Sequence, residues 1–258
     1  MFTRSLALAL VACALAPHAE AWPADLSQRI ARDALKLAPR SLVELFLENE
    51  AEIFADARSS KMPALDLVYR DLAKGRLGED TREALNREFA ERSKALQGKD
   101  FRGAVIALGA TYRLAVDLAD PAVGSGLGSD ARGGAIRREF YSFVTTNVEK
   151  IPVVVVRPES MRLALQGLPG FLDEVATRTP PQTLMLREEA QEAGRVLRAA
   201  EIDFRSPVFA VGSTAYSRSV SAVAATWIAI WRSAGGDMGR QKPARILQPR
   251  RTIFHQEK

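Results

Sequence analysis

The most apolar stretch of the chain covers residues 102–118 (RGAVIALGATYRLAVDL), where almost every position after the first is apolar or small. A helix that is apolar around most of its circumference is usually buried, so this stretch is expected to form the central helix of a core. Its interior charges are Arg113 and Asp117, which share one helix face because they lie four residues apart. That face is either a narrow solvated stripe or the floor of a cleft that holds chemistry.

Segments with an apolar residue at every third or fourth position surround this stretch and predict further helices. Ser41, with Glu44 three residues later, forms a capping-box pattern that starts one of them. Residues 151–156 (IPVVVV) form the one strand-like run; with no second such run to pair with, they are either a strand or an extended connector. Residues 206–212 are expected to form a linker. The other helices are predicted at residues 24–38, 64–74, 79–96, 134–149, 159–166, 171–177, 184–200 and 213–234.

The pattern therefore predicts an all-α fold with a single multi-helix domain over residues 22–236. Residues 237–258 carry six basic residues and little periodicity. Such a composition is typical of a mobile, basic tail.

The first 21 residues have the features of a secretory signal peptide. Arg4 precedes an apolar run at residues 6–16, and a small-x-small cleavage site (Ala-Glu-Ala) ends at residue 21. The run is too short to anchor the chain in a membrane. We therefore expect Trp22 to be the first residue of an exported protein, periplasmic or extracellular, without a transmembrane segment. The alternative is acylation of Cys13, which ends a lipobox-like sequence but comes early in the apolar run.

Composition excludes several kinds of site. Signal removal would take away the single cysteine and one of the two histidines, leaving only His255. A chain without a thiol can form neither a disulfide nor a cysteine-based metal site. The net charge of +5 comes from 36 basic and 31 acidic residues. This mild basicity permits an anionic or lipid ligand but does not indicate specific nucleic-acid binding.

The central stretch also contains a spaced motif. Residues 109–117 (GATYRLAVD) read Gly-x3-Arg-x3-Asp, and Pro121 follows. The motif resembles the core helix of zinc-dependent phospholipases C and of the fungal zinc nucleases that cleave single strands, which read Gly-x3-His-x3-Asp followed by a Pro and a His. Trp22 matches their N-terminal Trp, and residues 215–237 resemble the final helix of bacterial members. The resemblance covers most of the mature length and implies the helical phospholipase C/P1 nuclease fold.

The chain departs from this family at the positions of the metal ligands. The resemblance places Ser27, Arg113 and Val123 where the family has its first His, its core-helix His and the His after the Pro. These three residue types are not zinc ligands, because zinc favours imidazole nitrogen and thiolate sulfur.

The family's later His-x3-acid pair aligns either with Arg137 and Tyr141 or with Arg138 and Ser142. We assign Arg138 and Ser142 to these degenerate metal-site positions. Of the ligands that the resemblance implies, Trp22, Asp56 and Asp117 remain. A mature chain with one histidine near its end cannot complete the family's zinc sites, so we expect no bound zinc and no cofactor.

We expect Arg113 to be mostly buried and paired with Asp117, because an unpaired buried arginine is costly. The leading hypothesis is an exported, non-catalytic relative of this family with a binding or structural role and no catalytic residues. One alternative is an active phosphodiester hydrolase that binds Mg²⁺ or Ca²⁺ through Asp56, Asp117 and Asp120. A second alternative, suggested by the basic tail and by the family's lipid chemistry, is a peripheral lipid-binding module.

Overall fold

The computed structural model describes residues 22–59, 63–72, 77–97, 101–123, 127, 131–155, 167–192, 198–239 and 252–254. These residues are almost all helical, so the chain is all-α as its hydrophobic pattern predicts. The predicted signal peptide, the predicted helix at 159–166 and most of the predicted tail lie outside them. None of the helices in the described part is both long and apolar enough to cross a membrane.

The elements of the described part are α2 (Ala24–Leu35), α3 (Arg40–Ser59), α4 (Pro63–Leu72), α5 (Glu79–Gln97), α6 (Phe101–Ala119), α7 (Ala131–Asn147), the 3-10 turn η1 (Val148–Lys150), β1 (Val153–Val155), α9 (Leu168–Thr177), α10 (Pro180–Glu192), the 3-10 turn η2 (Ala199–Glu201), α11 (Pro207–Ser233) and β2 (Thr252–Phe254).

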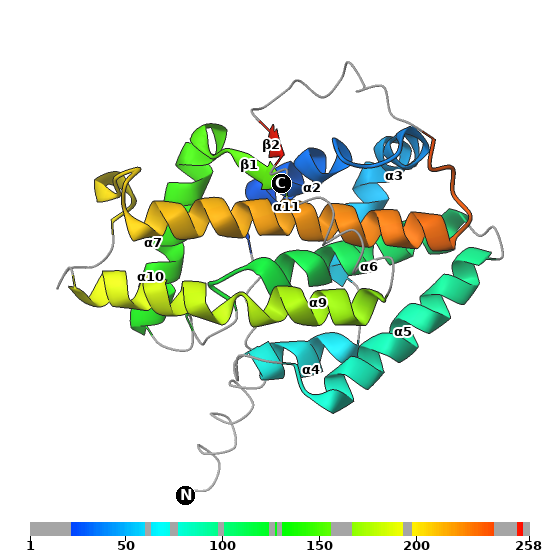
Figure 1. Cartoon of the computed structure of the whole chain (residues 1–258), viewed down its shortest axis with the longest axis horizontal. Coiled ribbons are helices and arrows are strands. Elements are labelled where there is room, and N and C mark those ends of the chain that lie inside the picture. Colours follow the sequence, from blue (N-terminus) through cyan, green and yellow to red (C-terminus); the bar gives the residue numbers. More distant parts are fainter. Residues whose placement is uncertain are drawn as a thin grey trace, which may run out of the picture.

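Helix α6 is the central helix that the sequence predicts. It packs along α11 and α3 and also contacts α5 and α9 (Figure 1). Its buried alanines, among them Ala107 and Ala110, allow neighbouring helices to approach closely. Trp227 of α11 reaches into this contact, where its Nε1 donates to the Leu108 carbonyl at 3.0 Å and its ring packs 4.9 Å from that of Phe46.

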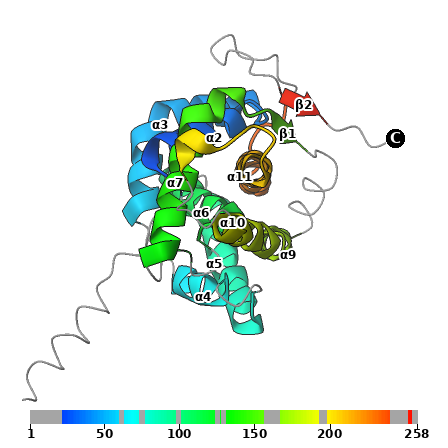
Figure 2. The same cartoon turned by 90° about the vertical axis from the view of Figure 1, so that its left-hand side faces the viewer.

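Helix α11 runs through the middle of the molecule. In Figure 2, which looks along α11, α2 and α3 lie on one side of it and α6, α9 and α10 on the other. The helix begins at Pro207, so the predicted linker at residues 206–212 is wrong. Ser206 caps it by accepting the Phe209 N–H at 3.2 Å. Gly212 does not interrupt the helix. It allows α11 to pack closely on α7, because a Cβ at this position would lie only 3.0 Å from Val144 Cγ2.

The start of α3 also differs from the sequence prediction. The helix begins at Arg40, and the Ser41 hydroxyl does not cap it. Instead, Ser41 Oγ donates to the Asp237 carbonyl at 2.8 Å and accepts from Trp231 Nε1 at 3.1 Å. Glu44 forms an ion pair with Arg40 at 2.6 Å. The expected capping box is therefore wrong, and Ser41 joins α3 to the segment that follows α11.

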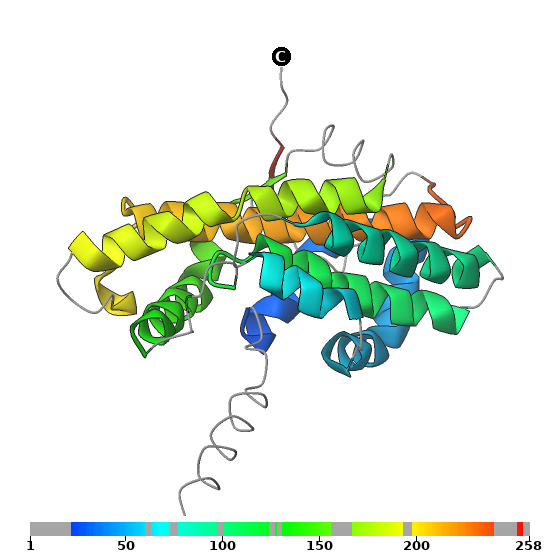
Figure 3. The same ribbon diagram turned by 90° about the horizontal axis from the view of Figure 1, so that it is seen from below.

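The strand-like run does find a partner. Strand β1 pairs in parallel with β2, with Val153 opposite Thr252 and Val155 opposite Phe254. The sequence pattern placed β2 within a mobile tail, so this pairing corrects that expectation for residues 252–254. Beside α11, helices α9 and α10 follow one another along its length (Figure 3). Helix α10 begins at Pro180, four residues before its predicted start at residue 184.

Candidate functional site

Trp22 fixes the start of α2 in the core. Its side chain is 2% exposed, and its indole Nε1 donates to Ser219 Oγ of α11 at 3.2 Å. Its ring lies 5.8 Å from that of Phe140 and 5.6 Å from that of Tyr141, both in α7. The Trp22 carbonyl accepts the Ser27 hydroxyl at 3.1 Å. The residue that we expect at the mature N-terminus is therefore held by two other helices and by its own first turn.

A cavity of about 80 Å³ lies directly beside this tryptophan. Four residues that the family resemblance selects, Trp22, Ser27, Arg113 and Asp117, all line it. Ser27 lies in α2 and Trp22 two residues before the start of that helix, whereas Arg113 and Asp117 both lie in α6. The complete lining is Trp22, Ala24, Ser27, Gln28, Phe54, Ala57, Tyr112, Arg113, Val116 and Asp117.

Tyr112 closes the cavity between α6 and α2. Its hydroxyl donates to the Ser27 carbonyl at 2.5 Å, and its ring meets that of Phe54 edge-on at 5.5 Å. Burial raises the pKa of Tyr112 far above its ordinary value. The side chain of Ser27 lowers the pKa in part, and the nearby Asp117 carboxylate raises it. The phenol therefore stays a neutral donor and cannot serve as a base at physiological pH.

Arg113 and Asp117 form the charged wall of the cavity. Arg113 Nε lies 3.6 Å from Asp117 Oδ2, and their side chains are 21% and 5% exposed. The expected ion pair is therefore present, with a buried acid and a partly accessible base. At this distance the pair is an electrostatic contact and not a short hydrogen bond.

Val123, Arg138 and Ser142 do not line this cavity. Val123 is half-buried in the turn after α6, whereas Arg138 and Ser142 are exposed on α7. Asp56 lies in α3, but its side chain is outside the described part of the structure. A shift of one residue along α7, from Arg138 and Ser142 to Arg137 and Tyr141, rotates the side chains by about 100°.

The inward pair on α7 is Arg137 and Tyr141. The Arg137 guanidinium lies 5.3 Å from the centroid of the Tyr141 ring. The Tyr141 hydroxyl donates to Asp120 Oδ2 at 2.6 Å, and the Ala122 N–H donates to Asp120 Oδ1 at 2.8 Å. This pair is the other of the two alignments that the family's His-x3-acid motif allows. The pattern of buried and exposed positions along α7 distinguishes the two pairs.

Asp120 is fully buried, and its burial raises its pKa to about 7. The hydrogen bonds from Tyr141 and Ala122 and the charge of Arg137 lower the pKa but only partly offset the desolvation. The nearby carboxylate of Asp117 raises it further. The carboxyl group of Asp120 is therefore partly protonated near neutral pH.

These contacts decide what the carboxylates can bind. Asp117 faces Arg113, and both oxygens of Asp120 already accept hydrogen bonds. In the described part of the chain, no group of three or more His, Cys, Asp or Glu side chains is arranged to hold a metal ion. Cys13, His18 and His255 lie outside that part. The side-chain oxygen ligands around the cavity are the Ser27 hydroxyl, the Gln28 amide, the Tyr112 phenol and the paired Asp117 carboxylate. The lining contains neither the imidazole nor the thiolate that zinc favours.

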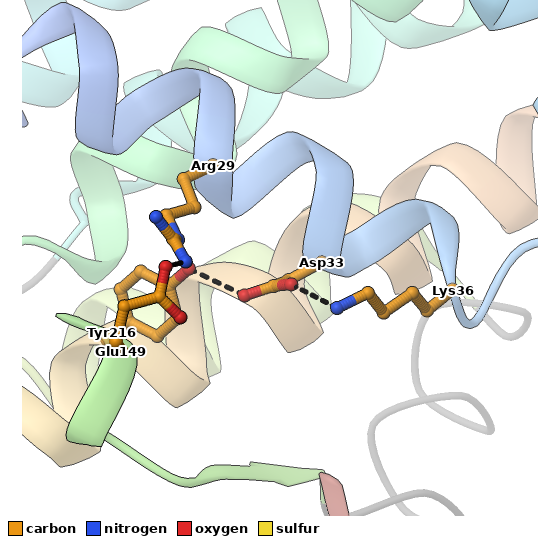
Figure 4. Close-up of polar contacts among 5 residues, drawn as sticks. All are labelled: Arg29, Asp33, Lys36, Glu149 and Tyr216. Atoms are coloured by element: carbon orange, nitrogen blue, oxygen red, sulfur yellow. Dashed lines mark hydrogen bonds and ion pairs between the residues drawn. The ribbon is translucent and has the colours of Figure 1, made fainter. Parts of the chain in front are cut away.

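A second charge cluster, centred on the buried Asp33, holds α2 against α11 (Figure 4). Asp33, which is 5% exposed, accepts the Tyr216 hydroxyl at 2.7 Å and pairs with Lys36 at 2.7 Å. Arg29, one turn earlier on α2, forms a close ion pair with Glu149 of η1. These contacts fix the helix that carries Trp22 and Ser27, so the cluster has a structural role.

No family model, no curated protein and no solved structure matches the chain.

Proposed function

We propose that the chain is an exported, non-catalytic relative of the zinc-dependent phospholipases C and single-strand zinc nucleases, with a binding or structural role. The observation that carries the proposal is the convergence of Trp22, Ser27, Arg113 and Asp117 on one cavity. These residues were selected by motif order alone, from helices far apart in the sequence.

The chemistry of the cavity supports a site without metals. A guanidinium is permanently protonated, so Arg113 brings a positive charge to the position that a zinc-binding histidine would occupy. Its charge neutralises the Asp117 carboxylate and repels a divalent cation. The ion pair therefore stands in for the metal and its ligand.

The size of the cavity also argues against catalysis. At about 80 Å³, it is well below the roughly 300–1,000 Å³ of typical small-molecule sites. Tyr112 and Phe54 fill the space beside the ion pair.

The proposal is tested by assaying the untagged protein for metal and for hydrolysis. Elemental analysis after dialysis should find no stoichiometric zinc. The hydrolysis of phosphatidylcholine, single-stranded DNA and bis(p-nitrophenyl) phosphate, with added Zn²⁺, Mg²⁺ or Ca²⁺, should equal that of Asp117→Ala. Tightly held zinc, or a hydrolytic activity that Asp117→Ala abolishes, would contradict the proposal.

Export is a separate part of the proposal. N-terminal sequencing of the protein recovered from the periplasm or the medium should read Trp22-Pro23. Retention in the cytoplasm, another first residue or a lipid on Cys13 would overturn this part without affecting the account of the cavity.

A further inference from the structure

A second cavity lies on the far side of α11. Residues 213, 214, 217, 218, 221 and 222 recur every three or four positions and therefore share one face of the helix. Together with β1 and α9 they line a cavity of about 390 Å³. Ser219, which accepts the Trp22 indole, is two residues from Ser217 and so lies about 200° around the helix. The two cavities are therefore separate, and the larger one has the volume of a small-molecule site.

One wall of this cavity is apolar and firmly held. It is formed by Val154 of β1, Phe171 and Val175 of α9, and Ala222 of α11. Ser217 Oγ accepts the Val154 N–H at 3.1 Å and lies 3.3 Å from the Pro152 carbonyl. These hydrogen bonds fix β1 against α11, so the wall is formed before any ligand arrives.

The same lining also carries an excess of positive charge. Arg218 and Arg178 both line the cavity, together with the acid Glu174. Glu174 forms a close ion pair with Arg178. Arg218 donates from its Nη1 to the Arg178 carbonyl at 2.6 Å, and no carboxylate of the described residues lies within ion-pair distance of it. The lining therefore holds two guanidinium groups and one carboxylate.

Burial and a neighbouring positive charge both destabilise the charged guanidinium of Arg218. Burial lowers the pKa of Arg218, and the neighbouring charge of Arg178 lowers it further. A half-buried arginine usually has an acidic partner, because a desolvated charge is costly. An anion in the cavity would supply that partner.

The lining also includes Ser213, whose hydroxyl is not exposed to the open space of the cavity. The Ser213 Oγ atom is buried and has no hydrogen-bond partner among the described residues. Buried polar atoms of this kind are uncommon in folded proteins. Ser213 lies one helical turn before Ser217, but it is five residues before Arg218 and therefore about 140° around α11 from it.

We propose that this cavity binds a small amphiphilic oxyanion: a carboxylate or phosphate that contacts Arg218, carried on an apolar body that packs against Val154, Phe171 and Val175. A guanidinium presents paired N–H donors that match the geometry of both oxyanions. The apolar wall requires the rest of the ligand to be hydrocarbon. The site goes beyond the proposed function and does not depend on it.

Calorimetric titration of the purified protein tests the proposal with decanoate and decyl phosphate, used below their micellar concentrations. At least one of them should bind at a single site and more weakly as salt rises. Acetate, inorganic phosphate and decyltrimethylammonium should bind far more weakly or not at all. The comparison of decanoate with decyl phosphate decides which oxyanion the site prefers.

Variants assign the binding to the cavity. Arg218→Gln should weaken binding about tenfold or more, the scale of one charge-assisted hydrogen bond, whereas Arg218→Lys should retain part of it. Arg232→Gln is the matched control, because it removes an exposed arginine from the same helix outside the cavity and should bind like the wild type. Circular dichroism checks that each variant is folded.

Three results would overturn the proposal. The first is no binding of either amphiphile at millimolar concentration. The second is equal affinity of the wild type and a folded Arg218→Gln variant. The third is inorganic phosphate binding as tightly as decyl phosphate, which would leave the apolar wall without a role.

Discussion

Replacing Arg113 with methionine removes the positive charge beside Asp117 while keeping most of the side-chain volume. The two partners are not equally buried: Asp117 is 5% exposed and Arg113 is 21% exposed. Asp117 also lies close enough to Asp120 for the two carboxylates to raise each other's energy. Loss of Arg113 therefore leaves a buried acid without its ion-pair partner, whereas loss of Asp117 leaves a base that reaches solvent.

The magnitudes follow from these exposures. Breaking a buried ion pair typically costs about 3–5 kcal/mol, and an exposed pair contributes about 0.2–1 kcal/mol. We expect Arg113→Met to lower the free energy of unfolding by about 3 kcal/mol, near the buried limit. Asp117→Asn should cost about 1–2 kcal/mol, between the two limits. The double variant should recover about 1–3 kcal/mol relative to the sum of the single losses.

Urea unfolding followed by tryptophan fluorescence and circular dichroism measures these values. The matched control is Arg40 with Glu44, which has the same four-residue spacing and an N–O distance of 2.6 Å but is 78% and 54% exposed. The coupling energy of Arg40→Met with Glu44→Gln should be only about 0.3–0.5 kcal/mol. A loss below about 0.5 kcal/mol for Arg113→Met, as for an ordinary surface change, would show that the pair is a solvated stripe.

Two further predictions concern the buried acids. The pKa of Asp120 is raised to about 7, so the folded state holds its proton more tightly than the unfolded chain, in which an aspartate titrates near 3.9. This contribution to stability is complete below about pH 4 and is lost as the pH rises to about 7. The Asp120→Asn variant should therefore lose this pH dependence of the free energy of unfolding and should be at least as stable as the wild type at pH 8. An unchanged pH dependence in the variant would refute the prediction. Tyr216→Phe removes the hydrogen bond to Asp33 Oδ2. This variant should lower the free energy of unfolding by about 1.5–3 kcal/mol. A loss below about 0.5 kcal/mol would mean that other contacts already satisfy the Asp33 carboxylate.

The central helix was predictable because its signal is local. An apolar pattern around a full helical circumference identifies α6 as buried without knowledge of its partners. The same reasoning failed at Gly212, where a residue that usually breaks helices allows α11 to approach Val144 of α7. It also failed for β2, because three residues that pair with a distant strand produce no periodicity of their own.

The cavity was predictable only in part. Motif spacing selected Trp22, Ser27, Arg113 and Asp117, which do lie together. It does not decide between Arg137 with Tyr141 and Arg138 with Ser142 on α7, because a motif with two degenerate positions fits two neighbouring registers equally well; Arg138 and Ser142 are the exposed pair. The hydrogen bond between Tyr141 and Asp120 depends on tertiary packing, and no single segment of the sequence encodes it.

Restoring histidine at the cavity tests the central claim most directly. In the double variant Ser27→His with Arg113→His, Asp117 is retained, so two imidazoles and a carboxylate would face the same cavity, a ligand set that zinc accepts. The control Arg70→His with Arg102→His places two histidines at exposed positions on α4 and α6. We expect the folded cavity variant to retain about one zinc ion per chain after dialysis, as a three-ligand site would, and the wild type and control to retain none. A cavity variant that folds and binds no zinc, or a control that binds as much, would contradict the claim that these positions form a former metal site.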